Sequence, residues 1–379
     1  MKFVNFIKKE PVLFAAILLA FISVLFVRPE PFLVLNSIDF RVICLLFCLM
    51  IVIQAFRTTN LLDWIALKLL SFCKNQKSLY FVLVFIVFFI SMLVTNDVAL
   101  LTFVPLTILI CEKANHSACK LIILETLAAN LGSSVTPMGN PQNLFLYSFF
   151  NFSTAEFFRT TLIIGIPSIV ILTIMILFIC RNRKNDEKTA FFLQETEQTF
   201  VKIDFRFWIY FVCLIFSLLT VFRIVDYRIT LFITIVLMLI CNKKLFKNVD
   251  YGLLLTFAGF FIFIGCLSAL PQVFNYLKSV LSSAYSTYLA GIFSSQVISN
   301  VPAAILLSGF TANPKELLLG VNVGGLGTLI ASLASVISFK LYKNSDSQSC
   351  TESFFVKFSV YNICLLIILG IVVWTLNSY

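Results

Sequence analysis

Two short polar sequences, Thr95-Asn96-Asp97 and Ser299-Asn300, interrupt long apolar runs of the chain. Amides and hydroxyls at such positions can hold a solute or an ion without a fixed charge. Asp97 adds an ionisable group, which is costly inside a membrane and is usually functional there. As a carboxylate it would bind a cation, and as an acid it would carry a proton. The structural alternative is that Asp97 caps the helix that begins beside it.

Each polar sequence is followed by a segment rich in glycine, hydroxyl and amide residues. Gly132-Ser-Ser-Val-Thr136 and Gly324-Gly-Leu-Gly-Thr328 lie 192 residues apart. The same separation pairs Asn140 with Ser332 and Asn143 with Ser335. A helix that breaks inside a membrane offers N–H groups and a positive helix end to anions, and free carbonyls to Na⁺. The alternative is that Gly-x-x-x-Thr only permits close helix packing, although prolines 137 and 141 would break a packing helix.

The candidate binding residues are neutral polar side chains or main-chain groups that a broken helix exposes. For substrate these are Asn96, Thr95, Ser133, Ser134, Thr136, Gly139, Asn140, Asn143, Ser299, Asn300, Gly325 and Thr328. For the coupling ion they are Asp97, Asn96, Gly132, Asn300, Gly324 and Gly327. We expect no catalytic residue, no cofactor and no metal site beyond one for Na⁺, with Na⁺ or H⁺ as the coupling ion. Glu125 either takes part in transport or faces the membrane interface.

Composition predicts that these residues lie in a membrane. Of the 379 residues, 60% are hydrophobic and 12% are charged, whereas soluble domains are about half apolar and a quarter charged. Apolar runs of membrane length recur along the chain, so the fold class is an all-α polytopic membrane protein. The net charge of +10 is concentrated in short loops, as the positive-inside rule describes. It therefore does not indicate nucleic acid.

Four segments carry the candidate residues. Two are predicted re-entrant helical hairpins, at 81–111 and 284–311, and two are predicted broken transmembrane helices, at 120–150 and 315–341. The 31 residues from Phe81 to Cys111 would form a helix of about 46 Å. That length is too great for one crossing of a ~30 Å hydrocarbon core and too small for two. Two arms of about 22 Å that fold back at Asn96 fit better, and they would place the tip near the midplane.

The order of these segments predicts two inverted-topology repeats. The first repeat covers residues 1–180, a cytoplasmic linker covers 181–204, and the second repeat covers 205–379. The distribution of Lys and Arg places the amino terminus in the cytoplasm and the carboxy terminus outside the inner membrane. The two hairpins then enter from opposite sides, as in alternating-access transporters.

The motifs resemble the ion transporter superfamily, which includes arsenite permeases, NhaD-type sodium–proton antiporters and divalent-anion–sodium symporters. The resemblance is carried by TNDVALLTFVP (95–105), TPMGNPQN (136–143), SNVPAAILL (299–307) and GGLGTLIASLAS (324–335). It is strongest to uncharacterised bacterial anion permeases of the arsenite-permease branch. In the symporters each tip reads Ser-Asn-Thr and binds carboxylate and Na⁺. Here Asp97 and Val301 replace the closing threonines, so the resemblance implies fold and transport class but not a dicarboxylate substrate.

We therefore expect a secondary active transporter of a small anion or oxyacid, a carboxylate or an inorganic oxyanion, coupled to H⁺ or Na⁺. The alternative is a Na⁺/H⁺ antiporter that moves no anion, and a passive channel is a further option. An intramembrane enzyme would need a nucleophile–base or metal constellation, and the single histidine, His116, lies in a loop. The expected partners are the lipid bilayer and the small anion. A homodimer stays open, and no nucleic acid is expected.

Overall fold

The chain folds into helices that follow the predicted apolar runs. The computed structural model describes residues 10–71, 73, 75–113, 116–181, 204–345 and 351–378. Within these ranges there is no β-strand. The helices of the first half are α2 (Pro11–Val27), α3 (Pro31–Asn36), α4 (Phe40–Arg57), α5 (Leu61–Leu70), α6 (Gln76–Val94), α7 (Asn96–Lys113), α8 (Cys119–Ser133), α9 (Pro141–Phe149) and α10 (Thr154–Ile179).

The second half continues the same all-helical architecture. It comprises α12 (Phe205–Val221), α13 (Tyr227–Cys241), η1 (Lys243–Asn248), α14 (Tyr251–Ser268), α15 (Pro271–Val280), α16 (Ala284–Ile298), α17 (Asn300–Ser308), α18 (Pro314–Gly324), η2 (Leu329–Ala331), α19 (Leu333–Lys343) and α20 (Thr351–Asn377). By length and composition, five of the described helices can cross a membrane: α4, α6, α10, α14 and α20. The predicted linker, 181–204, lies almost entirely outside the described residues.

Aspartates fix the start of several apolar helices. Asp39, Asp204, Asp226 and Asp250 each precede a helix and accept a hydrogen bond from a main-chain N–H of its first turn. An N-cap of this kind satisfies one of the donors that the helix itself leaves unpaired. Charged residues at the ends of the apolar runs therefore set the helix boundaries.

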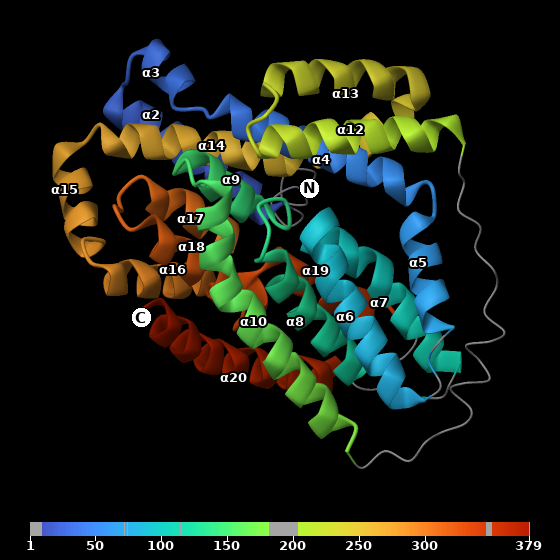
Figure 1. Cartoon of the computed structure of the whole chain (residues 1–379). Helices are drawn as coiled ribbons and strands as arrows, with labels where there is room; N and C mark the ends of the chain where they lie inside the picture. Colours follow the sequence, from blue (N-terminus) through green and yellow to red (C-terminus); the bar gives the residue numbers. More distant parts are fainter. Residues whose placement is uncertain are drawn as a thin grey trace, which may run out of the picture.

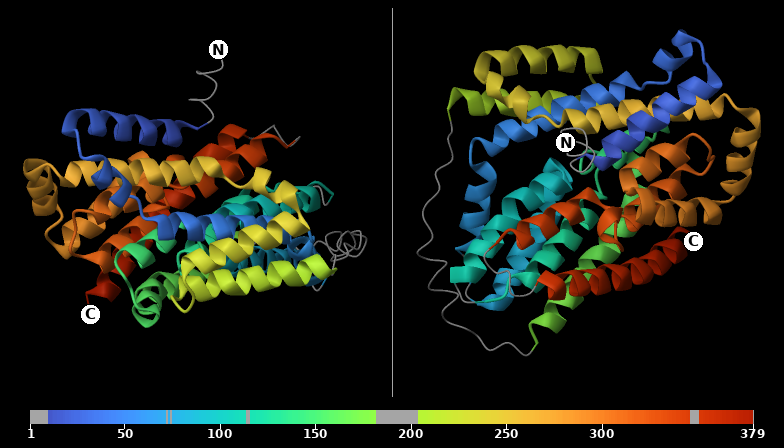
Figure 2. Two further views of the ribbon diagram at one scale, coloured as in Figure 1. Left: turned by 90° about the horizontal axis from the view of Figure 1, so that it is seen from above. Right: turned by 180° about the vertical axis from the view of Figure 1, so that it is seen from behind.

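The two halves interlock through equivalent pairs of helices. In each half, the first arm of the hairpin packs against the first segment of the broken helix, α6 on α8 and α16 on α18. The second arms cross over, because α7 packs against α19 and α17 packs against α9. Figure 1 shows α16, α17 and α18 grouped at one end of the molecule and α6, α7, α8 and α19 at the other. Helices α10 and α20 lie side by side and cover both groups (Figures 1 and 2).

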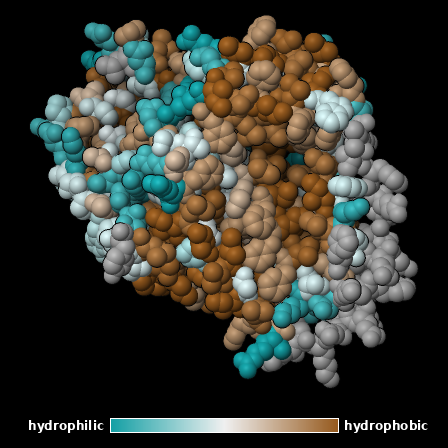
Figure 3. Space-filling model, viewed as in Figure 1, coloured by the Kyte–Doolittle hydropathy of each residue, from teal (hydrophilic) through white to brown (hydrophobic). Residues whose placement is uncertain are grey.

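The outer surface is strongly apolar. Large side chains stand exposed on several helices, among them Phe26 (85% exposed), Phe178 (76%) and Ile240 (75%). Brown, hydrophobic atoms dominate much of the face in Figure 3. An apolar surface of this extent is unfavourable in water. It suits a protein whose helices are surrounded by lipid, as the composition predicted.

The first hairpin is longer than predicted. Its arms have 19 and 18 residues, which corresponds to about 28 and 27 Å instead of about 22 Å. The first arm begins earlier because Asn75 and Ser78 form a reciprocal capping box. The second hairpin and both helix breaks lie within a few residues of the predicted bounds. That the hairpins are re-entrant, and that the halves are inverted in the membrane, stay predictions.

Candidate functional site

The two helix pairs turn at residues with the same unusual backbone. Thr95 has φ 78° and ψ 147°, and Ser299 has φ 73° and ψ 153°. A positive φ is uncommon for residues other than glycine and costs about 1–3 kcal/mol when the ψ is extended. The following residues, Asn96 and Asn300, then begin the second helix of each pair. The two tips are thus built alike, 204 residues apart.

Each tip is hydrogen-bonded to the broken helix of its own half. The N–H of Asn96 donates to the carbonyl of Gly139 (3.1 Å), and the hydroxyl of Ser299 donates to the carbonyl of Ala331 (3.4 Å). Residues 139 and 331 are again 192 apart. Each precedes the N-cap residue of the second segment, Asn140 or Ser332. The break and the tip therefore form one unit in each half.

Each of the two predicted threonines bonds to the first arm of the hairpin in its own half. Thr136 donates its hydroxyl to the carbonyl of Met92, and Thr328 donates to the carbonyl of Gln296. Both acceptors lie three residues before the tip residue. These hydroxyls are used within the protein, and Thr328 is exposed. The serines behave similarly, because Ser133 and Ser134 donate to the carbonyls of Asn130 and Leu131.

Two buried asparagines join the two broken helices. Asn130 accepts from the amide of Asn96 (3.1 Å) and from the hydroxyl of Ser332 (2.9 Å), and it donates to Ser335 (3.3 Å). Asn322 accepts from Asn140 (3.3 Å) and donates to Asn143 (2.7 Å). Each member of the predicted pairs Asn140/Ser332 and Asn143/Ser335 thus contacts the buried asparagine of the opposite half.

Close packing explains the glycines at the start of each break. A Cβ on Gly132 would overlap the carbonyl oxygen of Phe88 and lie 2.6 Å from the hydroxyl of Ser91. A Cβ on Gly324 would lie 2.8 Å from both Cβ and Oγ of Ser295. Ser91 and Ser295 are 204 residues apart, like the tips. Gly132 and Gly324 therefore do permit close helix packing, as the packing alternative for Gly-x-x-x-Thr expected. Both helices also break there, so the two interpretations hold together.

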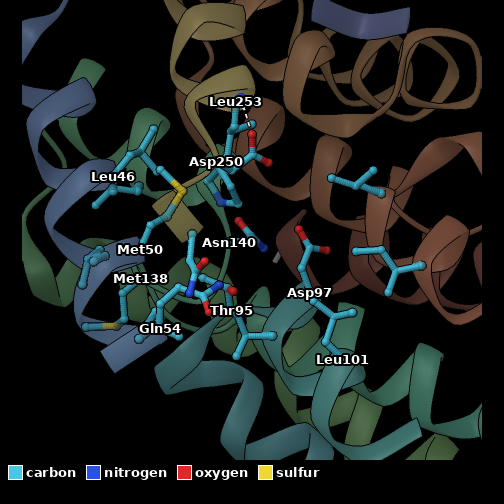
Figure 4. A pocket seen from close by; sticks show the side chains of 18 residues that line it. Leu46, Met50, Gln54, Thr95, Asp97, Leu101, Met138, Asn140, Asp250 and Leu253 are labelled. Atoms are coloured by element: carbon cyan, nitrogen blue, oxygen red, sulfur yellow. Dashed lines mark hydrogen bonds between the residues drawn. The ribbon is translucent and has the colours of Figure 1, made fainter. Parts of the chain in front are cut away.

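A pocket of about 170 Å³ lies beside the first tip. Its polar lining residues include Asp97, Thr95, Asn140 and Asp250, which Figure 4 shows around a common space. Leu46, Met50, Met138 and other apolar side chains form the remaining walls. The lining includes two carboxylates and, among the described residues, no lysine or arginine. Its charge is suited to a cation or a neutral acid.

The structure does not support the capping role for Asp97. Its Oδ1 is buried and has no hydrogen-bond partner among the described residues. Instead the side chain of Asn96 accepts the N–H of Asp97 (3.0 Å). The carboxylate points into the pocket at the beginning of α7 (Figure 4). It is therefore free to receive a cation or a proton.

Glu125 does not face the membrane interface, which corrects one of its two predicted roles. It is fully buried in α8, and the hydroxyl of Thr107 on α7 donates to one carboxylate oxygen. Its other oxygen, Oε2, has no partner among the described residues. Glu125 does not line the pocket that contains Asp97.

The structure brings only some of the candidate residues together at this pocket. Thr95, Asp97 and Asn140 line it, and Asn96 lies behind it, bonded to Asn130. Ser299, Asn300, Gly325 and Thr328 gather at the other tip and are not part of the lining described. The amide of Asn300 is buried against Gly325, where a Cβ would lie 2.8 Å from its nitrogen. Within the described residues this amide makes no hydrogen bond to the protein.

Sequence reasoning missed four residues: Asn130, Asn322, Gln296 and Asp250. The first two could have been found from the sequence. The alignment that pairs Gly132 with Gly324 also pairs Asn130 with Asn322, when it is extended two residues towards the amino terminus. Gln296 has no amide counterpart, since Met92 stands at the equivalent position. Asp250 lies immediately before α14. It is exposed and caps α14, but it also lines the pocket.

Comparisons with known proteins agree with a transport role. The family model described as citrate transporter (CitMHS) matches residues 6–323. An uncharacterized transporter of Methanocaldococcus jannaschii is 36% identical over 319 residues, which cover 82% of this chain and 84% of the relative. Inner membrane protein YbiR of Escherichia coli is 30% identical over 308 residues, 80% of each chain. The putative transporter arsB of Dictyostelium discoideum is 28% identical over 143 residues, 38% of this chain and 25% of its own length.

The apolar helical architecture and these matches lead to one assignment. Because the family model spans most of the chain, this protein belongs to the citrate transporter family and is a multi-pass membrane transporter of the ion transporter superfamily.

Proposed function

We propose that the chain is a secondary active transporter that moves a small anion or oxyacid across the inner membrane, coupled to H⁺ or Na⁺. The observation that carries the proposal is Asp97, an unpaired carboxylate at a helix–helix tip that lines a pocket. An ionisable group in this setting is expensive to retain unless it binds a charge during transport. The inner membrane is inferred from the similarity to inner membrane protein YbiR of Escherichia coli.

In this proposal the two tips and the two breaks form the translocation site. Asp97 binds the coupling ion, and the amides of Asn96 and Asn300 contribute to binding of solute or ion. The equal backbone geometry of Thr95 and Ser299, and the crossed bonds of Asn130 and Asn322, support two related halves. Related halves of opposite orientation would permit alternating access by a rocking motion. In this proposal the amino terminus lies in the cytoplasm and the carboxy terminus outside, as the distribution of Lys and Arg predicts.

The lining of the pocket favours one alternative specifically. Asp97 and Asp250 are both acidic, and no basic residue accompanies them in the described lining. Such a site repels a free anion and attracts a cation. A Na⁺/H⁺ antiporter that moves no anion is therefore the second candidate. For anion transport, the solute must enter protonated or together with a cation.

Counterflow in proteoliposomes tests the proposal. Vesicles loaded with citrate, another carboxylate, or an inorganic oxyacid such as arsenite are diluted into trace labelled solute. Transient accumulation above the level in empty liposomes identifies a carried substrate. If no solute exchanges but Na⁺ pulses release protons from the vesicles, the antiporter replaces the proposed function.

A further inference from the structure

Several of the carbonyl groups that each broken helix releases are already hydrogen-bonded to a side-chain amide. In the first half, Nδ2 of Asn143 donates to the carbonyls of Ser133 (3.4 Å), Ser134 (2.9 Å) and Thr136 (3.1 Å). One –NH₂ group thus lies at the point where three carbonyl oxygens converge. A bound cation would need the same position.

In the second half, a different side-chain amide, that of Gln296, bonds to the carbonyls of the break. Nε2 of Gln296 donates to the carbonyls of Gly324 (2.7 Å) and Leu326 (3.0 Å). Its Oε1 accepts the N–H of Thr328 (2.9 Å). Gln296 lies on α16, in the hairpin, whereas Asn143 lies on α9, after the break. The two amides are thus not equivalent by position, yet both fill the break of their own half.

Three neighbouring carbonyls in the breaks also accept hydrogen bonds. The carbonyl of Gly139 accepts from Asn96, that of Val135 accepts from Thr161, and that of Ala331 accepts from Ser299. Carbonyl oxygens released by unwound helices are the groups that coordinate Na⁺ in transporters of this general architecture. Here the carbonyls named above take their partners from the protein, as buried main-chain groups require.

We propose that the amides of Asn143 and Gln296 exclude Na⁺ from the two helix breaks, so that neither break provides a Na⁺ site for transport. This inference rests on the proposed function and narrows its coupling ion. The amides replace the cation as partner of the carbonyls, so Na⁺ could bind only after an amide is displaced. Displacement would leave the buried amide of Asn143 or the half-buried amide of Gln296 unpaired, which is unfavourable.

In this proposal Asp97 is the residue left for coupling, and the ion that it carries is a proton. Among the described lining residues, the charged group that faces Asp97 across the pocket is Asp250, just before α14. The other polar ones, Gln54, Thr95, Asn140 and Asn248, are neutral. Glu125, on the adjacent helix α8, is bonded to Thr107 and is not part of the lining.

Sodium binding to the purified protein tests the inference without any transport assay. The melting temperature and the binding of radioactive Na⁺ are measured in NaCl, with KCl and choline chloride at equal ionic strength as references. The variants exchange each amide for the residue at the equivalent position of the other half, Gln296→Met after Met92 and Asn143→Ser after Ser335. Gln272→Met, on the exposed face of α15, is the matched control.

We expect no specific Na⁺ binding by the unaltered protein or by the control. Gln296→Met and Asn143→Ser should melt at lower temperature in KCl, and NaCl should restore part of the loss because free carbonyls can then coordinate the ion. Saturable, Na⁺-specific binding by the unaltered protein would overturn the inference, and so would folded variants that show no response to Na⁺. Since solute counterflow is measured separately, a failure here leaves the proposed transport function standing.

Discussion

Asn130 and Asn322 lie 192 residues apart in the sequence, and each bonds to the broken helix of the opposite half. Asn130 contacts Ser332 and Ser335, and Asn322 contacts Asn140 and Asn143. Each asparagine lies in the last turn of the segment that precedes a break. The bonds therefore tie the two breaks into one buried polar layer, so movement at one break is expected to affect the other.

Removing either asparagine should destabilise the protein. Asn130→Ala and Asn322→Ala each leave several buried polar partners unsatisfied, which costs about 1–3 kcal/mol. The double variant should lose less than the sum of the two if the layer acts as a unit. Thermal unfolding in detergent gives the measurement. Asn362→Ala is the control, since the Asn362 side chain bonds only to the carbonyl of Phe358 among the described residues, and it should lose less than either single variant.

The glycines of the breaks should not tolerate a methyl group. Gly132→Ala forces a Cβ into the carbonyl of Phe88, and overpacking of this kind costs about 1–3 kcal/mol or more. Gly370→Ala is the matched control, because its Cβ would lie 3.9 Å from Cγ1 of Val323, the nearest atom outside its own stretch of helix. That variant should be neutral or slightly stabilised. Yield and melting temperature of the two variants compare them directly, and equal values would contradict the packing described.

Asp250 should influence coupling through its charge alone. Asp250→Asn keeps an N-cap for α14, since asparagine caps as well as aspartate, but it removes a negative charge from the pocket that Asp97 shares. Fewer cations then gather near Asp97. The pH of half-maximal uptake should move to lower pH, by on the order of 0.5 unit. Asp226→Asn, which keeps the equivalent cap of α13, should leave the pH profile unchanged.

Glu125 is expected to support the fold and not the coupling. Glu125→Gln retains an acceptor for the hydroxyl of Thr107, so the melting temperature and the pH profile of uptake should both stay close to those of the unaltered protein. Glu125→Ala removes that acceptor and opens a cavity, and it should lower stability by about 2 kcal/mol or more. A lost pH response in a folded Glu125→Gln variant would instead assign the proton to this residue.

Local sequence signals predicted the helices and the breaks well. The apolar runs, the prolines near Gly139 and the glycines at 132 and 324 act on their own segments, so their consequences can be derived without the fold. The contacts of the site depend on helices far apart in sequence. Gln296 reaches the carbonyl of Leu326 only because α16 packs against α18. Asp250 lines the pocket only because the chain before α14 passes beside it. The positions of Gln296 and Asp250 in the site therefore do not follow from the spacing of residues in the sequence.

The central claim is that Asp97 carries the ion that drives transport, and proton movement tests it most directly. Proteoliposomes are prepared without Na⁺, the carried solute is added, and external pH is followed together with solute uptake. We predict that solute entry makes the external medium more alkaline. Asp97→Asn should exchange solute without moving protons, and Asp63→Asn, on helix α5 outside the pocket, should behave like the unaltered protein. Solute-linked proton movement that persists in Asp97→Asn would contradict the account.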